Sequence, residues 1–212
     1  MKHRLISGLG ILMAFAGSDA ALAVDPPAFA PAQGGPQVSV ADVAIFPAGA
    51  TVAGASILTR YNTYVDGTIS TSGLTPNGAY SFWIVVFNNP EFCVGGCQGD
   101  DFPPDGLPAG TGDPRVRASV LWGGGFIANG AGAAQVEFHL DRGRAPGEVR
   151  FGPRLRRPRH ADIHIVLRSH GPAVAGEAAD QIGRFDGGCT PEEIAMAMCT
   201  NANVLFAAHV AP

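Results

Sequence analysis

The chain has 212 residues, of which 46% are hydrophobic and 15% charged, and 14 basic against 18 acidic residues give a net charge of −4 at pH 7. This balance argues against a general nucleic-acid binder. The length provides one domain with its own core rather than two, and the 29 glycines and 17 prolines favour turns and strands over helices.

The N-terminus has the pattern of a secretory signal peptide. Basic residues at 2–4 precede an apolar stretch at 5–17, and Ala21-Leu22-Ala23 provides the small-x-small pattern of a cleavage site. The apolar stretch is too short to remain as a membrane span, and no other segment is long and apolar enough for one. We therefore predict a signal peptide at 1–23 and a secreted or periplasmic protein with no transmembrane segment after cleavage near Ala23.

Residues 24–37 (VDPPAFAPAQGGPQ) are rich in proline and alanine and almost uncharged. This composition is typical of a semi-extended linker. We therefore expect a single folded domain at 38–212.

From residue 38 onward, short runs rich in β-branched and aromatic residues alternate with turn signals. They predict strands at 38–46, 51–60, 63–72, 79–88, 116–127, 133–140, 161–169 and 203–210. The run Tyr80 to Phe87 (YSFWIVVF) is nearly all apolar, which predicts a central strand covered on both faces. The triplet Gly123-Gly124-Gly125 follows a strand without a helix after it, and predicts a bulge or a close backbone contact.

One short helix is expected near the C-terminus. Thr190 is a suitable N-cap, Pro191 suits the first helical position, and Glu192 and Glu193 lie in the first turn. Strands with Gly/Pro turns and one such helix predict an all-β fold, an antiparallel β-sandwich of about 7–8 strands with long loops. A closed barrel is the alternative.

The four cysteines are Cys93, Cys97, Cys189 and Cys199. An even number in an exported chain predicts two disulfides, for which three connectivities exist. We favour the pairs Cys93–Cys97 and Cys189–Cys199, because each closes a short loop that has little core to hold it. A zinc site is the alternative, although the C-x3-C and C-x9-C spacings differ from the repeated C-x2-C of zinc ribbons.

Two long connections, 89–115 and 141–160, have no periodicity, and loops of this length are often functional. The first carries five acidic residues and the second carries all seven arginines that lie between 142 and 159, so opposite charge favours their proximity. Guanidinium groups match the oxygens of an anionic glycan or envelope surface. The candidate anion-binding patch is Arg154, Arg156, Arg157 and Arg159, and an ordinary solvated loop is the alternative.

Residues 160–172 (HADIHIVLRSHGP) alternate between apolar and polar side chains. The alternation predicts a strand with its apolar side chains on the core. His164 and Arg168 would then lie on the outer face, and His170 would lie at the start of the next loop.

A metal site is one interpretation of these histidines. His139 lies on the polar side of another predicted strand, VEFHL, and an antiparallel neighbour could bring it beside His164, with His170 as a third ligand. Imidazole ligands on paired strands suit zinc or copper. The alternative is that such alternation simply marks a half-solvated antiparallel strand.

Nucleophilic hydrolysis has little support in the sequence. A G-x-S-x-G motif is absent, and Ser169 and His170 are adjacent, so their side chains would point apart on a strand.

Three segments, GLTPNGAYSFWIVVFNNPEFC (73–93), RASVLWGGGFIANGAG (117–132) and DIHIVLRSHGPAVAGEAADQIGRFDGGC (162–189), resemble a group of uncharacterised exported bacterial β-sandwich proteins. The resemblance implies export and a single domain, but no reaction. A weaker similarity to the chordin-type repeat, through Gly73-Leu74-Thr75-Pro76 and His170-Gly171-Pro172-Ala173, also implies a β-sandwich.

The sequence therefore favours a non-catalytic binding or structural module of the cell envelope or the extracellular space. A zinc- or copper-binding protein is the alternative, and a secreted hydrolase is the least favoured. We expect no cofactor other than such a metal ion, and no nucleic-acid partner.

Overall fold

The computed structural model describes residues 34–46, 51–106, 110–196 and 198–212. The predicted signal peptide and most of the predicted linker lie outside these residues. Within them the strands are β1 (Gln37–Ile45), β2 (Val52–Arg60), β3 (Tyr64–Thr71), β4 (Gly78–Phe87), β5 (Ala118–Ile127), β6 (Ala134–Asp141), β7 (Val149–Phe151), β8 (Asp162–Pro172) and β9 (Ala202–His209). The eight predicted strands are confirmed within a few residues, and β7 was not predicted.

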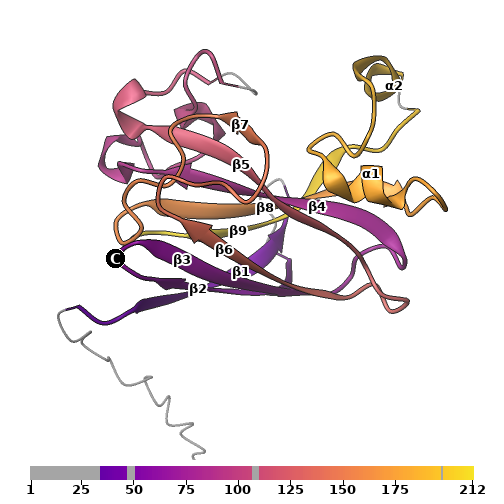
Figure 1. The fold of residues 1–212 in the computed structure, drawn as a ribbon, viewed down its shortest axis with the longest axis horizontal. Helices are drawn as coiled ribbons and strands as arrows, with labels where there is room; N and C mark the ends of the chain where they lie inside the picture. Colours follow the sequence, from indigo (N-terminus) through magenta and orange to yellow (C-terminus); the bar gives the residue numbers. More distant parts are fainter. Residues whose placement is uncertain (1–33, 47–50, 107–109, 197) are drawn as a thin grey trace, which may run out of the picture. The chain divides into compact units, whose positions relative to one another are not determined.

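All nine strands belong to one antiparallel sheet in the order β6-β3-β2-β1-β9-β8-β4-β5-β7 (Figure 1). The all-β antiparallel fold is thus confirmed, but the sandwich of about 7–8 strands is corrected to a single curled sheet. The reason is β9, which pairs with β8 on one side and with β1 on the other. It thereby joins the strands β6-β3-β2-β1 and the strands β8-β4-β5-β7 into one sheet.

The curl of the sheet is visible in its core. Phe138 on β6 and Phe82 on β4 are far apart in the strand order, yet their ring centroids lie 5.9 Å apart. Both belong to one cluster of buried side chains. The face that holds this cluster is called the inner face below, and the opposite face is called the outer face. Right-handed strand twist accounts for this tendency of a wide sheet to coil.

Strand β4 is buried along its whole length, as predicted. Its residues Phe82, Ile84 and Val86 contribute to the cluster on the inner face. Trp83, Val85 and Phe87 belong to a second cluster on the outer face, together with residues of the segment that follows β4. That segment holds three short 3-10 helices, η1 (Pro90–Phe92), η2 (Gly99–Asp101) and η3 (Pro114–Val116), and it covers one end of the outer face.

Two short α-helices, α1 (Ala178–Gly183) and α2 (Pro191–Ala195), follow β8. The N-cap prediction for α2 is confirmed: Thr190 Oγ1 accepts a hydrogen bond from Glu193 N at 3.2 Å, and Glu193 Oε2 accepts one from Thr190 N at 2.8 Å. Together they form a capping box. Helix α1 was not predicted.

Both predicted disulfides, Cys93–Cys97 and Cys189–Cys199, are present. The first closes a loop between η1 and η2, and the second ties the segment that contains α2 to the start of β9. No helix in the described part of the chain combines the length and the apolar character that a membrane crossing requires.

The glycine triplet on β5 forms both features that were predicted for it. The register between β4 and β5 shifts where Phe82 pairs with Gly124 and Trp83 pairs with Trp122, so that Gly123 is the extra residue of a bulge. At Gly125, a Cβ atom would lie 1.9 Å from the carbonyl oxygen of Ile182 in α1. The missing side chain therefore lets α1 lie directly on the sheet.

We expect the substitution Gly125→Ala to lower the free energy of unfolding by about 1–3 kcal/mol, because the added methyl group must displace backbone rather than a flexible side chain. Urea denaturation measures this change. Gly130→Ala is the matched control, since a Cβ there meets no atom within 4 Å. A loss at Gly125 no larger than that at Gly130 would contradict the close contact.

Candidate functional site

The first candidate metal ligand, His139, lies on the exposed side of β6. Its Nδ1 donates to Asp66 Oδ1 at 2.7 Å, and its Nε2 lies 3.3 Å from Asp141 Oδ1. The hydrogen bond to Asp66 is the main reason why the pKa of His139 is raised. Both ring nitrogens of His139 therefore contact carboxylates of β3 and β6, and the ring packs against that of Tyr64.

The other two candidates lie on the outer face of β8. His164 packs edge-on against Phe87, with ring centroids 5.1 Å apart, and burial lowers its pKa to about 4. A hydrogen bond of 2.8 Å joins His170 Nε2 to Ser81 Oγ. Burial, and then the charge of Arg168, lower the pKa of His170 to about 4. Both imidazoles are thus neutral at neutral pH.

The structure does not bring the three histidines together. Strands β3, β2, β1 and β9 separate β6 from β8, and His164 and His170 are six residues apart along one strand, about 20 Å at 3.3 Å per residue. In the described ranges, no group of three or more His, Cys, Asp and Glu side chains could hold a metal ion. The predicted metal site is therefore corrected: the three histidines lie in three separate environments. The alternation of polar and apolar side chains on an ordinary strand explains their positions.

Three serine–histidine contacts, around two histidines, occur in the described part of the chain, and none was anticipated. Besides Ser81 and His170, the ring of His209 lies 3.0 Å from Ser39 Oγ and 2.9 Å from Ser56 Oγ. Ser56, Ser81, His170 and His209 are buried, and Ser39 is half-buried. The contacts satisfy polar groups inside the fold and give no support to a hydrolase.

Arg60 is a buried charge that the sequence did not reveal. Its Nη1 donates to the carbonyl oxygens of Pro158 at 3.2 Å and Ala161 at 2.6 Å, and its Nη2 donates to that of His209 at 2.9 Å. Burial lowers the pKa of Arg60 to about 10, and the charge of Asp162 opposes this effect. Arg60 therefore joins β2 to β9 and to the turn that precedes β8.

The predicted arginine patch is largely occupied by contacts within the chain. Arg156 Nε donates to Pro153 O at 2.7 Å, and Arg159 donates to the carbonyl oxygens of Gly34 and Gly35. Arg157 Nη1 lies 3.0 Å from Glu91 Oε1. Among the four, the side chain of Arg154 makes no hydrogen bond to another described residue. An anionic surface as the partner of this patch stays a prediction.

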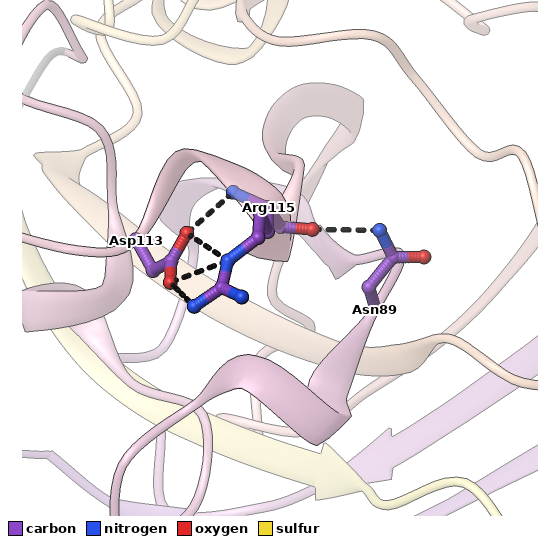
Figure 2. A network of polar contacts seen from close by, with 3 residues as sticks. All are labelled: Asn89, Asp113 and Arg115. Carbon is purple, nitrogen blue, oxygen red and sulfur yellow. Dashed lines mark hydrogen bonds and ion pairs between the residues drawn. The ribbon is translucent and has the colours of Figure 1, made fainter.

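The two long connections meet, as their opposite charges suggested. Arg157 and Glu91 form one link between them. Asn88, directly before the first connection, adds another, because its Nδ2 donates to Arg154 O at 2.8 Å while its Oδ1 accepts from Arg156 N at 2.6 Å. The first connection is also held by hydrogen bonds of its own, which Figure 2 shows. Asn89 Nδ2 donates to Arg115 O at 2.6 Å, and Asp113 Oδ1 accepts from Arg115 N at 2.8 Å. These bonds fix the segment that lies beside the outer face.

A hollow of about 760 Å³, called the outer cleft below, lies on the outer face of β4, β8 and β9. Its apolar wall is formed by Trp83, Val85, Phe87, Val166, Phe206 and Ala208. Cys97 and Phe102 of the fixed segment border it on one side. Clefts of this size and character are typical of sites for small ligands.

Three charged or titratable side chains line the outer cleft: His164, Arg168 and Arg150. Because Arg168 follows His164 by four residues on β8, they lie about 13 Å apart along the strand. Arg150, Arg168 and Trp83 also border a smaller hollow of about 350 Å³ that Cys189 lines as well. Both arginines are therefore at one end of the cleft, and the neutral His164 is at the other.

The sequence located two members of this site. It placed His164 and Arg168 on the outer face of β8, and both line the cleft. Arg150 was counted only as part of the arginine-rich connection, because the short strand that carries it gives no alternating pattern. Comparison with known proteins returned no matching family model, no matching curated protein and no matching solved structure.

Proposed function

We propose that the protein is an exported, non-catalytic binding module that holds a small, largely apolar ligand in the outer cleft. Export is supported by the signal-like pattern at 1–23 and by two disulfides in a chain with an even number of cysteines. The resemblance to a group of uncharacterised exported bacterial proteins is consistent with export.

The observation that carries the proposal is the aromatic wall of the outer cleft. Phe87 and Trp83 are buried, with 1% and 8% of their surface exposed, and both line the cleft. Phe46 is 42% exposed and meets Phe206 edge to face at 6.4 Å. An apolar ligand would remove from water the exposed surface of Phe46 and of the half-buried Phe206, Val166 and Ala208, which provides the main driving force for association.

The neutral fluorescent probe 1-aminoanthracene tests this function. We expect saturable binding with enhanced fluorescence, and at least a tenfold weaker affinity in the variant Ala208→Phe, because the new ring fills the cleft. Ala202→Phe is the matched control, since Ala202 lies on the same strand, is exposed and does not line the cleft. Absence of saturable binding to the unaltered protein, or equal affinities of the two variants, would refute the proposal.

A further inference from the structure

The end of the outer cleft near β7 is built from Arg150, Arg168 and Trp83, and Phe185, which lines the smaller hollow, packs against Trp83. The Arg168 guanidinium lies 4.4 Å from the centroid of the Trp83 ring, and the Arg150 guanidinium lies 5.9 Å from that of Phe185. The two rings meet edge to face, with centroids 4.7 Å apart. Cation–π contacts of this kind hold both cations against the wall of the cleft.

Neither arginine is neutralised by a close carboxylate. Arg168 donates no hydrogen bond to an acceptor among the residues that the structure describes, and its Nε is buried without a partner. The carboxylate nearest to Arg150 is that of Glu148, whose Oε1 lies 3.9 Å away in an exposed pair, and such pairs are weak. A guanidinium group has five donors, so this end offers many unused donors to a ligand.

The local charge also favours an anion. Burial lowers the pKa of Arg168, and the neighbouring charge of Arg150 lowers it further, while Asp186 opposes both effects. Asp186 Oδ1 accepts a hydrogen bond from Gly188 N at 3.0 Å, within its own loop. Arg168 thus faces one cation, Arg150, and one acidic side chain, Asp186, while Glu148 lies beside Arg150 in the exposed pair. A negative charge between the two arginines would relieve their repulsion.

The opposite end of the outer cleft has a different character. His164 packs against Phe87 and is neutral because burial lowers its pKa to about 4. Between the two ends, the wall consists of apolar side chains, among them Val85 and Val166. A ligand with a charge at each end would leave one charge without a partner in an apolar environment, which is costly.

We infer that the outer cleft binds a single-headed amphipathic anion, in the simplest case a medium-chain carboxylate, with its head between Arg150 and Arg168 and its apolar chain directed along Trp83 and Val85 toward His164. This inference rests on the proposed function and names the chemical class of the ligand. The planar guanidinium fork matches a carboxylate, and such charge-assisted hydrogen bonds are the stronger kind.

Displacement of 1-aminoanthracene by octanoate and by octan-1-ol tests the inference, because the two compounds share the apolar chain and differ in the head. At neutral pH we expect octanoate to displace the probe at a concentration at least tenfold lower than octan-1-ol. In the variant Arg168→Gln this preference is expected to disappear, while displacement by octan-1-ol stays unchanged and shows that the cleft is intact.

Arg184→Gln is the matched control, because Arg184 is exposed and lies outside the cleft. It should keep the full preference for octanoate. Equal displacement by the two compounds in the unaltered protein, or a preference that survives Arg168→Gln, would overturn the inference and leave the proposed function standing. If 1-aminoanthracene itself fails to bind, the proposed function fails with it.

Discussion

Acidification from about pH 7.5 to about pH 5 is expected to lower the free energy of unfolding by on the order of 5 kcal/mol, through three histidines that the fold keeps neutral. Burial lowers the pKa of His164, His170 and His209 to about 4 from an ordinary value of 6.5. Between these two values, the unfolded chain binds protons that the folded chain does not. Stability is therefore complete above about pH 6.5 and is lost as the pH falls toward 4.

At two of these histidines, a neighbouring positive charge lowers the pKa in addition to burial. Arg60 lies near His209 and Arg168 lies near His170, and each positive charge disfavours protonation of the imidazole beside it. Asp186 partly opposes this effect at His170. Urea denaturation at a series of pH values measures the loss directly. A free energy of unfolding that is flat between about pH 7.5 and 5 would contradict the neutral burial of the three rings.

Two variants separate buried from exposed histidines. His164 makes no hydrogen bond with another described residue, so the substitution His164→Leu should remove about one third of the acid-induced loss and change stability little at neutral pH. His139→Gln is the control, because the pKa of His139 is raised by Asp66 and its contribution has the opposite sign. That variant should show an acid-induced loss at least as large as that of the unaltered protein. A smaller acid-induced loss in His139→Gln than in His164→Leu would contradict the neutral state of His164 in the fold.

Replacement of Arg60 by leucine is expected to lower the free energy of unfolding by about 3–5 kcal/mol. The leucine would leave the carbonyl oxygens of Pro158, Ala161 and His209 without their donor. Each buried acceptor without a partner costs about 1–3 kcal/mol, and the release of a buried charge offsets part of the sum. The midpoint of urea denaturation should therefore shift strongly to lower concentration.

The control for this substitution is Arg184→Leu. Arg184 is exposed, and its nearest carboxylate, that of Asp180, lies 3.8 Å away. Its replacement should change stability by no more than about 0.5 kcal/mol, as is usual for surface positions. If Arg60→Leu were equally mild, the three carbonyl contacts would contribute nothing to the fold.

The strands were predictable because side chains on opposite faces of a strand meet different surroundings. The alternation of Ile163, Ile165 and Leu167 identified the buried side of β8, and all three are completely buried. The short β7 was missed because its three residues, Val149–Phe151, are too few to show a period. Helix α1 was missed because Glu177, its N-cap residue, makes no side-chain capping bond.

The arrangement of the strands could not be predicted in the same way. Alternation shows that a strand has a buried face, but it does not show which strands share a sheet. The β-sandwich prediction failed at this point, because nothing in the sequence of β9 indicates that it pairs with β8 and β1 together. The outer cleft was hidden for a similar reason, since Trp83, Arg150, Arg168 and Phe206 come from four different strands.

The position of β9 also restricts the order in which the molecule can assemble. Strands β6, β3, β2 and β1 form one half of the sheet and β8, β4, β5 and β7 the other, and β9 provides the hydrogen-bonded connection between them. It follows the eight other strands along the described chain. During synthesis, both halves must therefore wait with an unpaired edge until residues 202–209 arrive. Completion of the sheet is thus a late, long-range event, of the kind that makes folding slow and sensitive to competing association.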